Sequence, residues 1–119
     1  MEILRWEGVA REQLGDGVAR RVVWGERATL ARFEFSRGMH AAPHQHEAEQ
    51  HTCVVSGALR IATRGREFIV RAGEMLLIPG DTEHEVWALE DSVVLAFFAP
   101  AREDWKQGDH HYLTGQSHG

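Results

Sequence analysis

The chain has 119 residues, which is enough for one domain with a single modest core. Its formal net charge is −5 and its only lysine is Lys106, so it has no basic cluster that could follow a nucleic-acid backbone, and we expect no nucleic-acid partner. The only cysteine, Cys53, excludes an intrachain disulfide, and the longest apolar run, 93–99, is far below the ~18 residues of a membrane helix. These features indicate a cytoplasmic protein without a membrane partner.

Short apolar segments rich in Val, Ile, Phe and Trp follow one another along the chain, separated by Gly, Pro and Asp. We predict strands at 21–25, 28–36, 51–57, 58–65, 67–74, 75–81, 84–90 and 92–100. Most connections are too short for crossover helices, so the strands must pair mainly antiparallel, as in an all-β sandwich or barrel. One helical turn is expected at 102–106, and a disordered tail at 114–119 leaves 1–113 as the single domain.

Histidines are concentrated in the stretch "GMHAAPHQHEAEQHTCVVSG", 38–57. His44 and His46 are two positions apart, so on an extended segment both side chains point to one face, with Cα atoms roughly 6.6 Å apart. Gln50 has the same parity, whereas His51 has the opposite one. A further ligand must come from elsewhere, and His84 follows a Pro-Gly-Asp turn at the end of an apolar segment. The spacing favours a metal site over a solvated polar loop.

Two groups of residues resemble the motifs of the cupin family. The first is Gly38, His44, His46, Gln50 and Gly57, and the second, fifteen residues further on, is Gly73, Pro79 and His84. This compact spacing is similar to that of single-domain bacterial cupins. The resemblance implies a cupin jelly-roll, or double-stranded β-helix, barrel with a ligand cluster inside its mouth.

The resemblance also implies one divalent transition metal ion, Zn, Mn, Fe, Co or Ni, held by His44, His46, Gln50 and His84. Gln50 stands where the usual motif has glutamate. A neutral ligand set leaves the full charge on the metal, which makes it a stronger Lewis acid, and it lacks the carboxylate that dioxygenase-type cupins can use as a base. Glu47 and Glu49 are alternative ligands or supporting groups, and Glu49 is a candidate catalytic residue.

The segment 89–105 resembles the closing strand of the pectin-degradation cupins, which open the ring of an unsaturated uronate. Phe98, Pro100 and Arg102 match that pattern, which would make Phe98 and Arg102 substrate-contacting residues. Ala96 stands where those proteins have the aspartate that transfers a proton. Either another acid or base has taken over, with candidates Glu34, Glu47, Glu49 and Glu85, or the scaffold serves a different substrate. We favour a different, less polar substrate, because a relocated base would have to meet strict geometry.

The sequence therefore predicts a metal-dependent lyase, isomerase or cyclase that acts on a small carbonyl or enol compound. A metal-dependent dioxygenase and a non-catalytic small-molecule binder or sensor are the alternatives. Arg102 would anchor an anionic group of the substrate. The predicted substrate pocket consists of Arg32, Phe33, Phe35, Met39, Trp87, Ala96 and Phe98.

A homodimer is expected as well. Cys53 and Val55 have the parity opposite to that of the candidate ligands, so they lie on an outer sheet face, and both are apolar enough to favour being covered.

Overall fold

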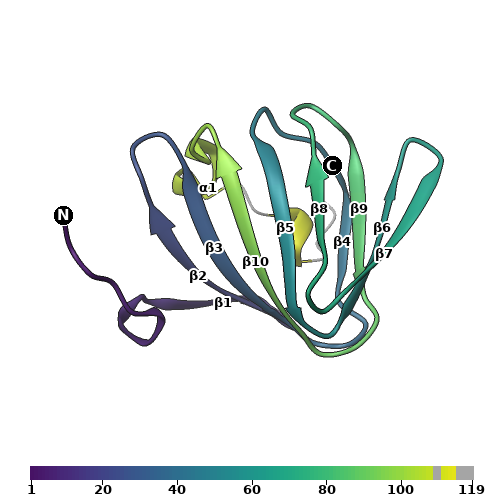
Figure 1. The fold of residues 1–119 in the computed structure, drawn as a ribbon, viewed down its shortest axis with the longest axis horizontal. Coiled ribbons are helices and arrows are strands. Elements are labelled where there is room, and N and C mark those ends of the chain that lie inside the picture. The colour runs from purple at the N-terminus through teal and green to yellow at the C-terminus, as the bar shows by residue number, and fades with distance from the viewer. Residues whose placement is uncertain (109–110, 115–119) are drawn as a thin grey trace.

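The structure is a computed structural model that describes residues 1–108 and 111–114, and in these residues the strands form two sheets (Figure 1). In order across the sheet, the first contains β1 (Arg11–Gly15), β2 (Val18–Trp24), β3 (Thr29–Phe35), β10 (Ser92–Ala99), β5 (Glu49–Ser56) and β8 (Met75–Ile78). The second contains β4 (His40–His44), β9 (His84–Ala88), β6 (Ala58–Thr63) and β7 (Arg66–Arg71). All of these pairings are antiparallel. The all-β, antiparallel jelly-roll prediction is confirmed.

Each of the eight predicted strands corresponds to an observed one, and two further strands were not predicted. The sequences of these two, "REQLG" in β1 and "HAAPH" in β4, lack an apolar run. They are strands because a partner in the sheet supplies backbone hydrogen bonds: β1 pairs with β2, and β4 pairs with β9. His40 is therefore the first residue of β4.

The core lies between the two sheets, and the alternation of side chains along the strands fills it. In β3, Ala31, Phe33 and Phe35 are buried. In β10, Val94, Ala96 and Phe98 are buried, as the parity of that strand predicts.

The turn at Gly57 joins β5 to β6, one strand from each sheet. Its φ of 88° lies in the left-handed region, where glycine is favoured. A Cβ atom at this position would collide with Ser92 and with the carbonyl oxygen of Asp91. The glycine therefore allows the sharp turn by which the chain passes from one sheet to the other.

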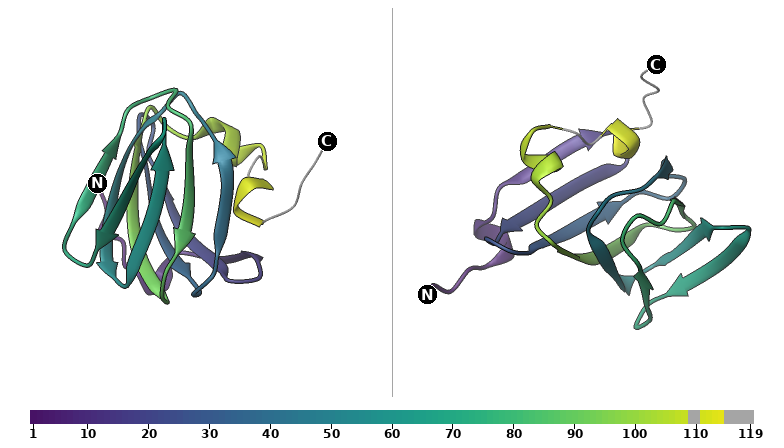
Figure 2. Two further views of the ribbon diagram at one scale, coloured as in Figure 1. Left: turned by 90° about the vertical axis from the view of Figure 1, so that its right-hand side faces the viewer. Right: turned by 90° about the horizontal axis from the view of Figure 1, so that it is seen from above.

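Two short helices follow the last strand. The first, α1 (Glu103–Lys106), is the predicted helical turn, and the second, α2 (His111–Thr114), was not predicted. Thr114, which we expected to begin a disordered tail, instead ends α2, and residues 115–119 of that tail lie outside the described residues. Figure 2 shows both helices on the same side of the molecule, where α2 contacts β4 and β1. No helix in the described part of the chain is long and apolar enough to span a membrane.

Candidate metal centre

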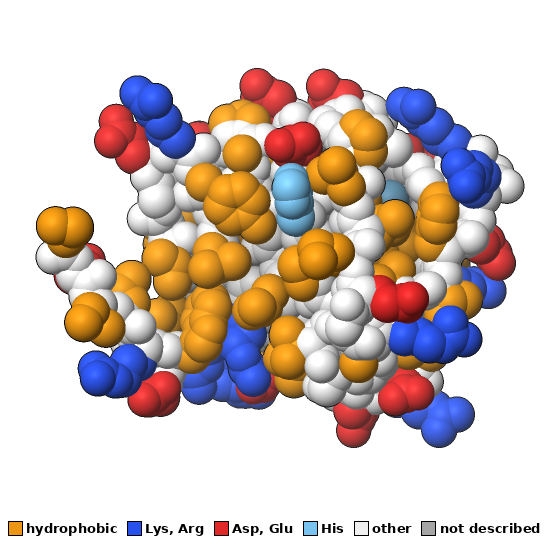
Figure 3. All heavy atoms as spheres, in the orientation of Figure 1, with side chains coloured by type: hydrophobic (Ala, Val, Ile, Leu, Met, Phe, Trp, Pro, Cys, Tyr) orange, Lys and Arg blue, Asp and Glu red, His pale blue; other side chains and the backbone are white. Residues whose placement is uncertain are grey.

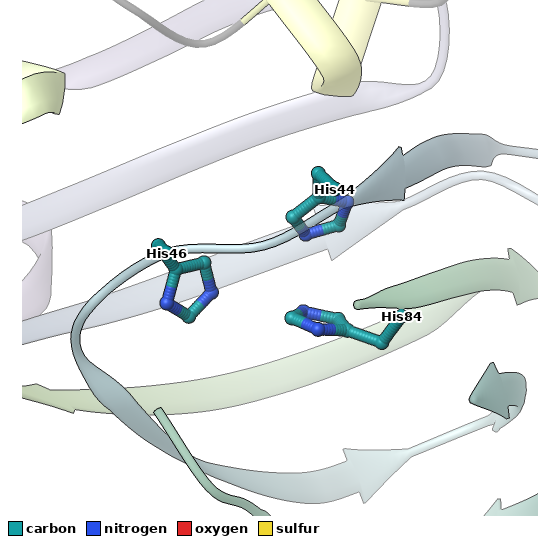
Figure 4. Close-up of side chains that lie close together, drawn as sticks. All are labelled: His44, His46 and His84. Atoms are coloured by element: carbon teal, nitrogen blue, oxygen red, sulfur yellow. The ribbon is translucent and has the colours of Figure 1, made fainter. Parts of the chain in front are cut away.

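Three histidines from neighbouring segments form a cluster. His44 ends β4 and His84 begins β9, and the two are paired across the sheet. His46 lies in the loop after β4. One ring nitrogen of each histidine lies within 4.8 Å of the others, which is close enough for all three to bind one ion (Figure 4).

The loop that carries His46 is tied to the turn that precedes His84. The backbone N–H of Asp81 donates a hydrogen bond to the carbonyl oxygen of His46 at 2.7 Å. Gly80 approaches the same loop so closely that a Cβ atom would collide with the carbonyl oxygen of Glu47. The two halves of the motif are thus held together by backbone contacts and not only by their strands.

Backbone carbonyl oxygens fix the protonation of all three rings. Each Nδ1 lies 2.7 or 2.8 Å from a carbonyl oxygen, in the pairs His44 with Ala42, His46 with Ala48, and His84 with Thr82. A carbonyl only accepts, so each Nδ1 carries the proton and each Nε2 presents a lone pair. The Nε2 of His84 is buried and has no hydrogen-bond partner among the residues that the structure describes. This unpartnered lone pair, with its two neighbours, is what a metal ion requires.

Gln50 lies on the inner face of β5 and completes the cluster. Its amide nitrogen donates a hydrogen bond to the Thr52 hydroxyl at 2.9 Å, which directs the amide oxygen toward His46. That oxygen lies 3.1 Å from the Nε2 of His46. Both atoms are acceptors when His46 is protonated on Nδ1, so they converge as two ligands of one ion would. The neutral set of three nitrogens and one oxygen fits Zn, Mn, Fe, Co or Ni.

The surroundings keep the imidazoles neutral. Burial, followed by repulsion from His84, lowers the pKa of His44 from its ordinary value to about 3. Burial and the nearby Arg102 guanidinium lower the pKa of His46 to about 4. Burial also lowers the pKa of His84. Neutral rings at physiological pH are the form that binds metal.

An apolar cavity of about 40 Å³ lies beside the cluster, inside the barrel. His44 and Gln50 border it, which connects the candidate metal centre to the apolar space. Five of the predicted pocket residues line its wall: Phe33, Phe35, Met39, Ala96 and Phe98.

Three other predicted site residues do not reach the cavity, because each lies on the outer face of its strand. Arg32 binds Glu34 at 3.2 Å on the outside of β3. Trp87 packs under the guanidinium of Arg60, 4.0 Å from the ring centroid, on the outside of β9. The side chain of Glu49 is 50% exposed on β5. The alternation that directs their neighbours inward turns these three outward. Arg32 and Trp87 were predicted to line the pocket and Glu49 to be catalytic, and these predictions are corrected.

Arg102 is buried beside the cluster, with 2% of its side chain exposed. Its Nε and Nη2 donate to the carboxylate of Asp104 at 2.9 and 2.7 Å. Its guanidinium stacks on the rings of Phe98 and Trp105. The remaining nitrogen, Nη1, is buried, and no group in 1–108 or 111–114 accepts a hydrogen bond from it. Arg102 is thus a fixed cation with a free donor close to the histidines.

The C-terminal helices supply cavity residues that the sequence analysis missed, namely Trp105, Tyr112 and Leu113. The Tyr112 ring stacks on His44, with 4.0 Å between centroids. A signal for these residues existed, because they are the only large apolar side chains after Pro100. These side chains were not recognised as core residues because the residues around them are polar and show no helical periodicity.

Solved structures share this fold. KdgF from Halomonas sp. has a TM-score of 0.77 and 29% identity, over 83% of this chain and 94% of its own. An RmlC-like cupin from Shewanella frigidimarina NCIMB 400 has a TM-score of 0.82 and 23% identity, over 88% and 96%. Bacillus subtilis oxalate decarboxylase, a protein with Mn(II) centres, has a TM-score of 0.71 and 21% identity, over 82% of this chain and 29% of its own.

No curated protein matches the chain in sequence. A family model does match, the cupin domain, over residues 31–99, which include the four converging side chains His44, His46, Gln50 and His84. With its two antiparallel sheets and its histidine cluster, the chain belongs to the cupin family.

Proposed function

We propose that the protein is a metal-dependent lyase, isomerase or cyclase that acts on a small carbonyl or enol compound. The observation that carries this proposal is the convergence of the Nε2 lone pairs of His44, His46 and His84 with the amide oxygen of Gln50. A divalent ion bound by these atoms would supply Lewis-acid polarisation of a substrate oxygen.

The protein's own groups would orient the substrate and exclude water. The unpartnered Nη1 of Arg102 is available to hold an anionic or carbonyl oxygen. The apolar wall around Ala96 keeps water away, which strengthens every electrostatic interaction at the reacting oxygen. A substrate with a substantial apolar part matches this wall better than a sugar acid does.

No carboxylate lines the apolar cavity in the part of the chain that the structure describes, so none stands in for the missing aspartate there. None of the four candidate glutamates lines the apolar cavity among the described residues: Glu34, Glu47, Glu49 and Glu85. Glu34 is bound by Arg11 and Arg32 on the outside of the barrel. This supports a changed substrate in preference to a relocated carboxylate base.

The neutral ligand set also weighs against the dioxygenase alternative. No carboxylate belongs to the converging set formed by the three histidines and Gln50. A neutral site favours polarisation of a bound oxygen atom over the oxygen chemistry that uses a glutamate ligand as a base.

Proton exchange in heavy water tests the proposal. The metal-loaded protein is incubated without oxygen with cyclic and open-chain 1,3-diketones, and loss of the C–H signal next to the carbonyl is followed by proton NMR. We expect metal-dependent exchange that disappears on chelation and in His84→Ala, while His51→Ala, whose side chain is 44% exposed, retains it. Turnover that requires oxygen would favour the dioxygenase. Ligand binding that survives His44→Ala with His84→Ala, without any exchange, would favour the binder.

A further inference from the structure

Tyr112 lies beside the candidate metal centre and lines the apolar cavity that His44 borders. Its ring is nearly parallel to that of His44, with an interplanar angle of 19° and centroids 4.0 Å apart. It comes from α2, which contacts β4, the strand that ends at His44. The tyrosine ring therefore covers the ring of His44, which is a candidate metal-binding residue.

The hydroxyl oxygen of Tyr112 is held by two buried N–H groups. The indole Nε1 of Trp105 donates to it at 2.7 Å, and Nη2 of Arg102 donates at 3.0 Å. Neither group can accept a hydrogen bond, so what they recognise is an oxygen with available lone pairs. Trp105 and Arg102 are 3% and 2% exposed, so water does not easily replace the phenol oxygen there.

The cavity that remains is too small for a substrate. Its volume of about 40 Å³ contrasts with the roughly 300–1,000 Å³ that small-molecule pockets occupy. Tyr112 and Leu113 form part of its wall. A molecule that is to reach the histidines from this side must displace the tyrosine ring.

We propose that the Tyr112 side chain is a stand-in for the substrate: it occupies the position that the substrate's ring takes when it binds. The natural ligand is then a planar ring compound with a phenolic or enolic oxygen. This ligand takes over the ring contact with His44 and the hydrogen bonds from Arg102 and Trp105. The unpartnered Nη1 of Arg102 adds a donor beside that oxygen, so a second oxygen on the ring, as in a hydroxy-ketone, is also held. The proposal deepens the proposed function and rests on it for the location of the substrate.

Tyr112 is the only tyrosine in the chain, which gives a direct test on the unaltered protein. The protein is prepared with ring-¹³C tyrosine and loaded with Zn²⁺, and the single aromatic signal is followed while p-cresol, the compound that corresponds to the tyrosine side chain, is added. We expect a saturable shift toward the position of an exposed tyrosine. Toluene, which has the same shape without the oxygen, should leave the signal in place at equal concentration.

Binding to variants provides the second measurement. Tyr112→Ala removes the competitor, so p-cresol should bind about tenfold more tightly than to the unaltered protein. In that variant, toluene should bind about tenfold more weakly than p-cresol, because the two donors stay unsatisfied. Leu113→Ala is the matched control: it enlarges the same cavity but leaves the hydroxyl in place, and should not distinguish the two compounds. Tyr112→Phe keeps the ring but loses the oxygen, so its affinity for p-cresol should lie between those of the unaltered protein and Tyr112→Ala. This variant replaces Tyr112→Ala in the test if Tyr112→Ala does not fold.

Equal binding of p-cresol and toluene to Tyr112→Ala would overturn the proposal, as would saturable p-cresol binding that leaves the tyrosine signal unmoved. Metal content is measured on the same samples. If Zn²⁺ binds but the tyrosine is not displaced, only the stand-in hypothesis fails. If the histidine cluster binds no metal, the proposed function fails while the displacement result remains interpretable.

Discussion

At the scale of single residues, the candidate metal centre depends on side chains that are fixed before any ion arrives. Thr52 is 3% exposed, and its hydroxyl accepts the hydrogen bond that orients the Gln50 amide. Without this bond the amide can rotate and present its nitrogen, which is not a ligand, toward His46. Groups that hold ligands in place typically change metal affinity by about 10- to 100-fold when they are lost.

Thr52→Val should therefore weaken Zn²⁺ binding about tenfold or more, with little effect on folding because the two side chains have nearly the same shape. Isothermal titration calorimetry measures the dissociation constant. Thr52→Ser is the control, since it keeps the hydroxyl that accepts the hydrogen bond from the Gln50 amide, and it should retain the affinity. An unchanged affinity in Thr52→Val would show that Gln50 is not a ligand.

The lowered pKa values of the histidines predict how the metal-free protein responds to acid. The pKa of His44 falls to about 3 and that of His46 to about 4 in the folded state, against about 6.5 in the unfolded chain. At pH values between the folded-state and unfolded-state pKa, the unfolded chain binds more protons than the folded protein. The contribution of these histidines to the free energy of unfolding is therefore full above about pH 6.5 and is lost as the pH falls toward 4. His44 alone accounts for up to about 1.4 kcal/mol per pH unit in that window.

Urea unfolding of the chelator-treated protein at pH 7.5, 6 and 5 measures this loss. His44→Asn should reduce the dependence on pH, because one linked proton is removed, whereas His51→Ala should leave it unchanged. A stability that is constant from pH 7.5 to 5 would contradict the neutral state of the buried rings.

At the scale of elements, Trp105 is the buried residue through which the C-terminal helix α1 packs on the barrel. Trp105 is 3% exposed, and the guanidinium groups of Arg20 and Arg102 lie over its ring, at 4.5 and 4.2 Å from its centroid. Phe33 and Phe98 contact its edge. The helix α1 is too short to be stable alone, so this contact decides whether it stays in place.

Trp105→Ala should lower the free energy of unfolding by about 3–5 kcal/mol, the usual cost of removing a buried tryptophan. Chemical denaturation followed by circular dichroism gives the value. Trp24→Ala, at a position that is 40% exposed, should cost far less. Equal losses in the two variants would mean that α1 and α2 do not depend on Trp105.

Strands with their own apolar pattern could be predicted from the sequence, and those without it could not. The eight apolar segments were found, whereas β4 depends on pairing with β9 and β1 on pairing with β2, which a local pattern does not reveal. The site shows the same division. Motif spacing identified His44 and His84, but Tyr112 reaches the cavity only through tertiary packing of a polar tail.

At the scale of the whole molecule, the outer face of the larger sheet is unusually apolar. Val55, Met75, Leu77 and Phe97 are 41–72% exposed there, on β5, β8 and β10. Figure 3 shows hydrophobic side chains gathered over these strands. Exposed apolar patches of this kind favour association between proteins. The homodimer therefore stays a prediction, and this face is the surface through which we expect the two copies to pair.

Size-exclusion chromatography with light scattering should give a dimer for the unaltered protein and a monomer for Val55→Glu with Leu77→Glu. Ile69→Glu, a change on β7 in the other sheet at a side chain that is 40% exposed, is the control and should leave the dimer intact. A monomeric unaltered protein would exclude pairing through this face.

The bond between the Asp81 N–H and the His46 carbonyl oxygen joins two loops that are far apart in the chain. An ion shared by His46 and His84 would close a loop of 38 positions, as a disulfide does in secreted domains. At a free metal concentration a thousand times the dissociation constant, this linkage adds about 4 kcal/mol to the free energy of unfolding. The amount of folded protein in a cell would then follow the supply of that metal, and starvation for it would remove the protein itself as well as its activity.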